Sequence, residues 1–99
     1  MYTVCMDGLQ FTWDENKNRS NRRKHGVAFE EAQTVFFDPQ AKVYFDPEHS
    51  EEEERFIILG TSYRLRVLVV CHCYRESETM IRIISARRAD KGEKNDYGS

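Results

Sequence analysis

The sequence predicts a small α+β domain, in which an antiparallel sheet has two N-terminal helices packed on one face and is followed by a short C-terminal helix. Apolar residues recur at helical spacing before residue 40, and from residue 41 onward they alternate with polar residues as in strands. A length of 99 residues gives room for one core, so we expect residues 1–99 to form a single domain. Residues 1–10 are expected to form an irregular N-terminal segment.

The first regular elements are predicted to be a strand and a helix. The segment QFTWD predicts a short strand, because Phe11 and Trp13 would share one face. Asp14 is suited to cap the helix that follows. Gly26 is suited to end it, since glycine adopts the left-handed conformation found there, and we expect the helix to run to about His25.

The next part of the chain predicts a second helix and then most of the sheet. FEEAQTVFFDP places apolar residues at helical spacing and is stopped by Asp38 and Pro39. After it, apolar and polar residues alternate in four strand candidates joined by polar connections: AKVYFD, RFIILGTS, RLRVLVVCHCYR and TMIRIISAR. Consecutive strands on short loops pair antiparallel, so we expect an antiparallel sheet.

The two longest strand candidates indicate which face of the sheet meets the helices. In the third candidate one face is wholly apolar: Leu65, Val67, Val69, Cys71 and Cys73. We expect this face to meet the helices. The opposite face is then the candidate functional surface: Arg64, Arg66, Leu68, Val70, His72 and Tyr74. In the last strand, alternation separates Ile81, Ile83 and Ser85 from Arg82, Ile84 and Ala86.

The C-terminal segment predicts one more helix. Asp90 and Glu93 have the spacing of a capping box, which favours a helix from about Lys91 to Tyr97. Glu93 and Tyr97 would then be neighbours on one face of this helix.

The charge distribution is compatible with a polyanionic partner. The formal net charge is −2, but six acidic residues lie within nine positions: Asp46, Glu48, Glu51, Glu52, Glu53 and Glu54. Without this segment the rest of the chain is net positive, as expected for a basic surface with a separate acidic loop. A solvated acidic loop on an ordinary protein explains the same pattern, and both interpretations stay open.

Several functional classes are disfavoured by the sequence. No apolar stretch approaches the roughly 20 residues needed to span a bilayer, and residues 1–10 lack a signal-peptide pattern, so we expect a cytoplasmic protein with no membrane partner. Three cysteines are an odd number and do not suggest a secreted disulfide framework. Cys71 and Cys73 are interpreted as buried thiols, because His72 would point to the other face of the strand. We expect neither a metal site nor a cofactor.

A group of basic and aromatic residues suggests phosphodiester chemistry. Arginine binds phosphate oxygens and stabilises charge on a phosphorane, histidine transfers protons near neutral pH, and tyrosine stacks on bases. RNA supplies its own nucleophile in the 2′-hydroxyl, so this chemistry requires no metal. The candidate residues are Lys24, His25, Arg55, Arg64, Arg66, His72, Arg82, Arg87 and Tyr97.

Most of these residues also have a purely structural explanation. Lys24 and His25 would close a helix, where a cation gains roughly 0.3 to 1 kcal/mol from the helix dipole. Arg64 fits a turn, His72 fits a hydrogen-bonded surface histidine, and Tyr97 could cover the sheet by packing.

Arg82 is the most informative of the candidates, because it lies among isoleucines in a strand. An unpaired buried charge costs several kcal/mol, so this side chain needs a partner. One possibility is an ion pair with Glu30, Glu31 or Glu93, and the other is an RNA phosphate. The residues alone leave both open.

A series of motifs in fixed order resembles the BrnT family of type II toxins. It comprises Trp13 and Asp14 with Lys17 and Asn21, KHGV at 24–27, FEEA at 29–32, Val35 and Phe36, ER at 54–55, Gly60, His72, RIISAR at 82–87, and Ala89, Glu93 and Tyr97. The resemblance covers about residues 11–97. It implies a RelE-like fold and a metal-independent endoribonuclease that cleaves RNA and inhibits translation and growth.

The resemblance also implies partners. A BrnA-like antitoxin with a ribbon-helix-helix DNA-binding part would neutralise the toxin, in a complex expected to be a 2:2 hetero-oligomer. Operator DNA would be bound only through the antitoxin. The alternative is a catalytically inactive interaction module that acts with the antitoxin as a co-repressor.

The catalytic roles are assigned at positions within the resemblance. Arg82 and Arg87 are expected to bind the scissile phosphate, and His72 is the first candidate for proton transfer. Lys24, His25 and Tyr97 are further catalytic candidates. The remaining arginines are expected to bind substrate: Arg55, Arg64 and Arg66.

Overall fold

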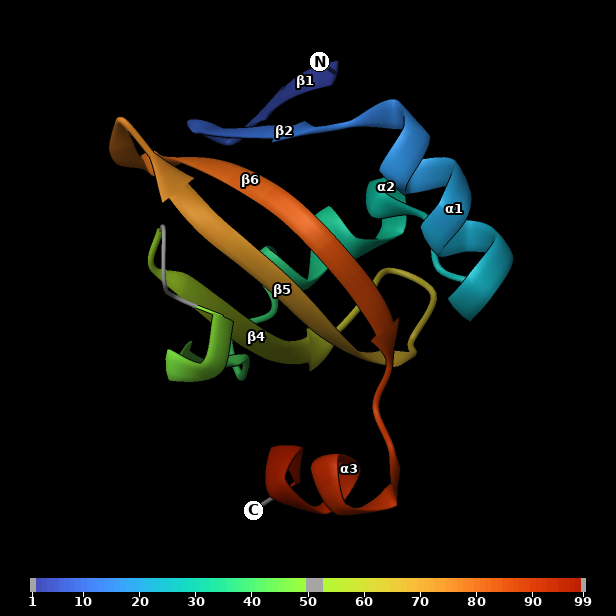
Figure 1. The fold of residues 1–99 in the computed structure, drawn as a ribbon. Coiled ribbons are helices and arrows are strands. Elements are labelled where there is room, and N and C mark those ends of the chain that lie inside the picture. The colour runs from blue at the N-terminus through green and yellow to red at the C-terminus, as the bar shows by residue number, and fades with distance from the viewer. Residues whose placement is uncertain (1, 50–52, 99) are drawn as a thin grey trace.

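The computed structural model describes residues 2–49 and 53–98 (Figure 1), and within them six strands form one mixed sheet with the order β1-β2-β6-β5-β4-β3. The strands are β1 (Tyr2–Met6), β2 (Leu9–Trp13), β3 (Lys42–Asp46), β4 (Arg55–Thr61), β5 (Val67–Arg75) and β6 (Ser77–Arg88). The helical segments are α1 (Glu15–His25), α2 (Phe29–Ala32), the 3-10 helices η1 (Gln33–Phe37) and η2 (Pro47–His49), and α3 (Lys91–Tyr97). The α+β class is therefore confirmed.

The N-terminal part of the sheet differs from the sequence prediction. Residues 2–10 are not an irregular segment, because β1 pairs antiparallel with β2; residue 1 lies outside the described residues. Asp7 and Gly8 join the two strands with φ angles of 49° and 83°, the left-handed turn that an Asp-Gly pair favours in hairpins. β2 then pairs parallel with β6, with Phe11 beside Ile81. The sheet is therefore mixed and larger than the small antiparallel sheet that we expected.

The helices agree with the predictions in part. Asp14 caps α1 by accepting from the backbone N–H of Asn16 at 2.8 Å, and Gly26 ends it with a φ of 69°. The predicted second helix is only a four-residue α-helix followed by a 3-10 helix, so two N-terminal helices are not confirmed. The capping box of α3 is present between Asp90 and Glu93, as predicted. No helix in the described ranges is long and apolar enough to cross a membrane.

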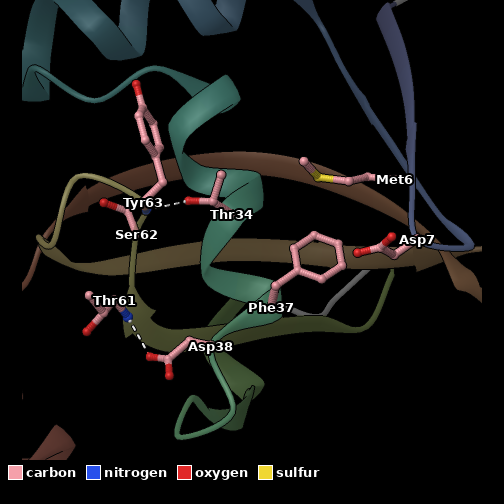
Figure 2. Close-up of a pocket in the computed structure, with 8 residues that line it drawn as sticks. All are labelled: Met6, Asp7, Thr34, Phe37, Asp38, Thr61, Ser62 and Tyr63. Carbon is pink, nitrogen blue, oxygen red and sulfur yellow. Dashed lines mark hydrogen bonds between the residues drawn. The ribbon is translucent and has the colours of Figure 1, made fainter.

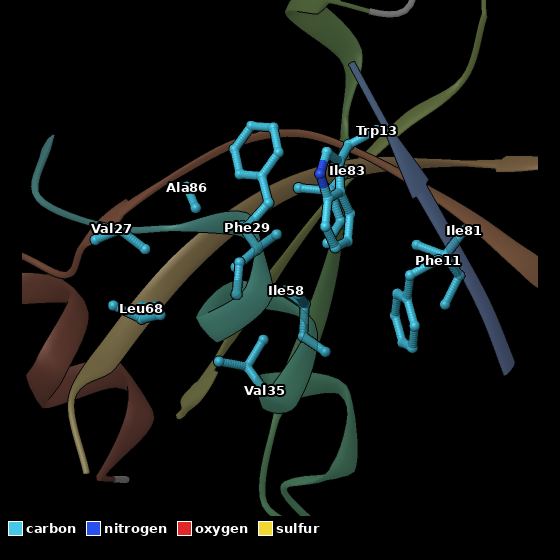
Figure 3. Packing of buried hydrophobic residues seen from close by; sticks show 12 residues of the cluster. Phe11, Trp13, Val27, Phe29, Val35, Ile58, Leu68, Ile81, Ile83 and Ala86 are labelled. Atoms are coloured by element: carbon cyan, nitrogen blue, oxygen red, sulfur yellow. The ribbon is translucent and has the colours of Figure 1, made fainter. Parts of the chain in front are cut away.

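The face of β5 that meets the helices is the opposite of the predicted one. Leu68 is buried in the main core together with aromatic side chains of β2 and α2 (Figure 3), and Val70 belongs to the same cluster. Val69, on the other face, belongs to a second cluster with Leu59 and Ala89, against which Tyr97 packs. Both faces of β5 are apolar because α3 covers part of the second face. Apolar alternation alone therefore could not identify the helix side.

Helix α1 is held in place by amide groups instead of apolar side chains. Its sequence, ENKNRSNRRKH, contains no aliphatic or aromatic residue, and its buried members are Asn18 and Asn21. The side-chain oxygen of Asn18 accepts from the Phe29 backbone N–H at 2.8 Å, and its side-chain nitrogen donates to the Glu30 carboxylate at 2.9 Å. These bonds fix the turn between α1 and α2.

Asn21 supplies hydrogen-bond partners for the part of the β6 edge that does not pair with β2. The pairing of β2 with β6 ends at Arg82, so the edge of β6 beyond it has no strand beside it within the described residues. The Asn21 amide donates to the carbonyl oxygens of Ala86 and Val27, both at 2.8 Å, and the Ala86 N–H donates to Asn21 Oδ1 at 3.1 Å. One side chain thus satisfies three buried backbone groups.

Replacement of Asn21 by alanine should lower the free energy of unfolding by about 3 to 5 kcal/mol, because each buried backbone group left without a partner costs about 1 to 3 kcal/mol. Urea unfolding followed by circular dichroism measures this change. Ser20→Ala is the matched control: Ser20 is exposed on the same helix, so the effect should stay within about 0.5 kcal/mol. A loss below about 1 kcal/mol in Asn21→Ala would contradict the assigned role.

Candidate functional site

The face of the sheet turned away from α1 and η1 carries three of the predicted arginines, and we call it the outer face. Paired strand residues share a face, which places these side chains on it: Tyr44, Asp46, Arg55, Ile57, Val69, Cys71, Cys73, Arg82, Ser85 and Arg87. Helix α3 lies over only one part of this face. Glu53, which precedes β4, lies over another part, with its carboxylate 3.9 Å from Arg55 and 3.5 Å from Arg75.

A bulge in β6 brings Arg82 and Arg87 onto the same face. These residues are five positions apart, and regular alternation would place them on opposite faces. The register shifts, however, because Cys71 pairs with Ser85 whereas the next residue of β5 pairs with Ile83. The extra residue reverses the alternation beyond it. Ala86 is therefore buried in the core, and the prediction that it shares the face of Arg82 is wrong.

Arg55 and Arg82 lie in one row across the sheet. Asp46 pairs with Arg55 on the β3 side, and Cys73 pairs with Arg82 on the β6 side. Since β4 and β5 are adjacent, about two strand spacings, or about 10 Å, separate the Cα atoms of the two arginines. This spacing suits one short segment of a phosphodiester chain, whose phosphate would take the place of the Glu53 carboxylate 3.9 Å from Arg55.

A pocket of about 260 Å³ lies between Arg55 and Arg87 on the outer face. Its other lining residues are Asp46, Ile57, Val69, Cys71, Ile84 and Ser85. The lining combines apolar side chains with these two guanidinium groups and the Asp46 carboxylate. The apolar side chains suit a base or sugar, and the guanidinium groups suit phosphates. Ser85 and Cys71 were not predicted as lining residues, because the bulge has no signature in the sequence and the face of Cys71 was expected to meet the helices.

Arg87 is held by an ion pair with α3. Its two terminal nitrogens donate to the two carboxylate oxygens of Glu93 at 2.8 and 2.7 Å. These hydrogen bonds keep the pKa of Glu93 below its usual value, and they raise the pKa of Arg87 further. Glu93 also accepts from the Asp90 N–H at 2.9 Å. Arg87 is thereby oriented at the edge of the pocket.

Tyr97 anchors the other end of α3. Its hydroxyl donates to Asp38 Oδ2 and accepts from Thr61 Oγ1 at 2.9 Å. The hydrogen bond to the Asp38 carboxylate raises the pKa of Tyr97. Tyr97 also packs against the cluster that contains Leu59 and Val69. In this structure it holds the helix onto the sheet.

Arg82 has no ion-pair or hydrogen-bond partner within residues 2–49 and 53–98. Its three predicted partners are engaged elsewhere. Glu30 accepts from Asn18, Glu31 accepts from Arg66, and Glu93 accepts from Arg87. The structural ion-pair interpretation of Arg82 is therefore contradicted. Its half-buried side chain remains available to an anionic ligand.

Arg64 and Arg66 lie on the other face of the sheet, beside the end of α1. Glu31 is buried, and Arg66 donates to it through two nitrogens, with Nε to Oε2 at 2.9 Å. Burial raises the pKa of Glu31, but hydrogen bonds from Arg66 and Ser62 outweigh burial and lower it overall. Arg64 lies 3.8 Å from the same carboxylate. Arg66 is thus mainly the counter-ion of Glu31.

Lys24 and His25 are exposed at the C-terminal end of α1. They precede Gly26, whose carbonyl accepts from Arg66 at 3.2 Å. The structure therefore groups Lys24 and His25 with Arg64 and Arg66, and it separates all four from the outer face.

His72 lies in the core and not on the surface. Its exposed fraction is 0%, and its ring centroid is 4.8 Å from that of Phe36 and 5.3 Å from that of Tyr74. Its Nδ1 lies 3.2 Å from the carbonyl oxygen of Val70. Burial lowers the pKa of His72 to about 4, so the ring is neutral at physiological pH. The predicted surface position of His72 is wrong, and RNA cannot contact the ring in this structure.

A second hollow, of about 460 Å³, lies between η1, the β1–β2 turn and the end of β4 (Figure 2). It is lined by Met6, Asp7, Thr34, Phe37, Asp38, Thr61, Ser62 and Tyr63. None of these residues is basic and none was a predicted site residue. Hydrogen bonds from Thr61 N–H to Asp38 and from Tyr63 N–H to Thr34 hold its walls. This hollow does not suit a polyanion.

Comparison with known proteins places these features in a family context. A family model described as "Ribonuclease toxin, BrnT, of type II toxin-antitoxin system" matches residues 13–93. The 1.1 Å crystal structure of the ribonuclease toxin BrnT from Brucella abortus is similar, with a TM-score of 0.61. The two chains are 24% identical, over 82% of this chain and 96% of that one, and this likeness shows the fold. A search of curated proteins found no match. Among the described residues, no cluster of three or more His, Cys, Asp or Glu side chains is arranged to hold a metal ion.

The buried His72 should make stability depend on pH. The unfolded chain binds the imidazole proton with a pKa near 6.5, whereas the folded protein does so near 4. The contribution of the neutral His72 ring to the free energy of unfolding is therefore fully present above pH 6.5. As the pH falls toward 4, the free energy of unfolding decreases by about 3 kcal/mol. Urea unfolding at several pH values measures this decline.

His72→Phe should flatten that part of the pH profile, because it keeps an aromatic side chain and removes the titrating group. His25→Phe makes the same substitution at an exposed position of α1 and controls for the introduction of phenylalanine. A parent protein equally stable at pH 7 and pH 4.5, or the same slope in His72→Phe, would contradict this assignment.

Proposed function

Because the chain belongs to the BrnT family of ribonuclease toxins of type II toxin-antitoxin systems, we propose that it is an endoribonuclease that cleaves RNA on the outer face of its sheet and so inhibits translation and growth. We also propose that it is RelE-like and acts without a divalent metal. The observation that carries the proposal is the position of Arg82. It lies in one row with Arg55, on the face that carries Arg87, and it lacks a counter-ion among the described residues.

The proposed mechanism uses charge stabilisation. The 2′-hydroxyl of RNA attacks the adjacent phosphorus and loses its proton to solvent water, and the bond to the 5′-oxygen of the next nucleotide breaks. This oxygen takes up a proton from solvent water, so that a 2′,3′-cyclic phosphate and a 5′-hydroxyl result. Negative charge develops on the phosphorane oxygens, where Arg82 and Arg55 can donate hydrogen bonds. Arg87, oriented by Glu93, lines the same pocket and would hold a neighbouring phosphate.

Other predicted residues receive different roles in this proposal. His72 is enclosed in the core, so contact with RNA is assigned to the arginines. Tyr97 is a positioning residue, since it fixes α3 beside the pocket. Lys24, His25 and Arg64 lie outside the outer face and are assigned to contacts with RNA beyond the cleaved bond.

The family implies an antitoxin as partner and RNA as target. We propose that the antitoxin is BrnA-like, that it binds as a 2:2 hetero-oligomer, and that only its ribbon-helix-helix part contacts operator DNA. We also propose that it neutralises the toxin by covering the outer face. Its acidic groups would then replace the RNA phosphates.

Arg82→Ala should lower the rate of RNA cleavage about 10²- to 10³-fold, as expected when one stabiliser of developing charge is removed. The melting temperature should stay near that of the parent, because Arg82 has no carboxylate partner to leave unpaired within the described residues. Single-turnover cleavage of a defined RNA and a thermal melt measure the two effects.

Arg19→Ala is the control for loss of one positive charge, since Arg19 is exposed on α1 and bonded only locally to Asn16. Its cleavage rate should match the parent. Normal cleavage by folded Arg82→Ala, or a large fall in its melting temperature, would remove Arg82 from the proposed site.

Cleavage by the antitoxin-free protein should persist in excess EDTA and should leave 2′,3′-cyclic phosphate or 3′-phosphate ends and 5′-hydroxyl ends. The reason is that the proposed chemistry uses only the 2′-hydroxyl and arginine side chains. End-group analysis of the fragments measures this. Loss of activity in EDTA with rescue by one metal would overturn the mechanism. A folded protein that binds the antitoxin but never cuts RNA would instead support the inactive co-repressor.

A further inference from the structure

Strand β3 is an edge of the sheet and exposes apolar side chains. It pairs with β4 on one side, and the strand order leaves its other side without a neighbour among the described residues. The exposed fractions of Val43, Tyr44 and Phe45 are 51%, 45% and 51%. An edge strand offers unpaired N–H and C=O groups that can bind another strand. Proteins usually protect such edges, and this one carries three large apolar side chains in succession.

We propose that β3 pairs antiparallel with β3 of a second copy of this chain. The two copies would be related by a two-fold axis perpendicular to the sheet that passes between the two Tyr44 residues. The two six-stranded sheets would then form one continuous sheet. This proposal stands independently of the ribonuclease function.

The sequence of β3, KVYFD, is self-complementary in this register. A two-fold axis perpendicular to the sheet leaves the two faces of the sheet unchanged, so only residues of the same face can lie opposite each other. The axis must then pass beside one residue, which lies opposite its own copy, and Tyr44 is one of the few residues of β3 that can take this central position. With that centre Lys42 lies opposite Asp46 of the second copy, and Val43 lies opposite Phe45. Opposite charges and apolar pairs directly across strands are both favourable.

Alternative centres are worse. Centring the pair on Phe45 would bring Pro47, which has no N–H, opposite Val43 of the second copy. Centring it on Val43 would place Lys42 opposite Tyr44 and leave Asp46 outside the strand pair. Only the Tyr44 centre uses all five residues of β3 and matches both charges.

The rest of the molecule allows this arrangement. Lys42 Nζ contacts the Asp96 carbonyl oxygen, so α3 lies at the Lys42 end of β3 on the outer face. Antiparallel pairing puts the two α3 helices at opposite ends of the interface, where they do not meet. The outer faces of both copies lie on the same side of the joined sheet. The charge pairs across the interface would add to the contacts that Lys42 and Asp46 make within their own chain.

The interface is small, so the dimer should be weak. Two five-residue strands bury less than the roughly 1,600 Å² of a standard stable interface. We therefore expect a concentration-dependent equilibrium with a dissociation constant of micromolar or higher, which sedimentation equilibrium of the intact chain would detect.

Charge reversal tests the register. Lys42→Asp or Asp46→Lys alone places like charges opposite each other and should weaken dimerisation at least about tenfold. The double variant Lys42→Asp with Asp46→Lys restores opposite charges and should recover most of the affinity. Lys17→Asp, an equal charge change on exposed α1, should have no effect. Failure of the double variant to recover overturns this register, provided that circular dichroism shows it folded.

A cross-link tests the same register without altering a charge. Tyr44→Cys in a Cys5→Ser background should form a disulfide-linked dimer on mild oxidation, because directly opposed strand residues have Cα atoms within disulfide reach. Leu65→Cys, at a site 85% exposed, should not. A chain that is monomeric at all concentrations and does not cross-link through position 44 overturns the proposal. If the β3 variants then weaken antitoxin binding, the edge belongs to the antitoxin.

Discussion

The side-chain amide of Asn21 is the interaction on which the arrangement of helix and sheet depends. Helix α1 has no apolar side chain to bury, so it cannot be positioned by the hydrophobic effect alone. The Asn21 side chain instead forms hydrogen bonds with backbone groups of Ala86 and Val27, as a neighbouring strand would. These hydrogen bonds hold the end of β6, the end of α1 and the turn between α1 and α2 close together. A buried amide that forms all its hydrogen bonds favours one geometry. A buried amide that lacks one of them lowers the stability of the fold.

The bulge in β6 determines which arginines lie on the outer face, as Asn21 determines how helix and sheet are arranged. It lies next to the residue that Asn21 holds, and the helix and the irregular strand therefore support each other. Without the extra residue, Arg87 would lie on the helix side, next to the core, while Arg82 would stay outside. Bulges commonly re-aim side chains next to active sites. Here a single backbone irregularity adds Arg87 to the face that carries Arg55 and Arg82.

Sequence reasoning identified the features that depend on neighbouring residues. The caps Asp14 and Gly26, the capping box of Asp90 and Glu93, and the four strands after residue 41 all follow from local patterns. Features that depend on distant partners were missed or reversed. The helix side of β5 could not be inferred, because α3 makes its second face apolar too. The Asp-Gly turn at residues 7 and 8 was a local signal that could have revealed the first hairpin.

The arginines show why composition cannot locate a site. In the sequence, Arg66, Arg82 and Arg87 are alike, each flanked by strand residues. In the structure, Arg66 is engaged with a buried carboxylate and stabilises the fold, and Arg87 is oriented by a partly exposed one. Arg82 faces the same surface as Arg87 but lacks such a partner among the described residues. Since a guanidinium group already bound to carboxylate must exchange one anion for another, Arg82 can bind a phosphate with the smallest loss of existing contacts. The functional difference between three identical side chains is thus set by where the carboxylates lie.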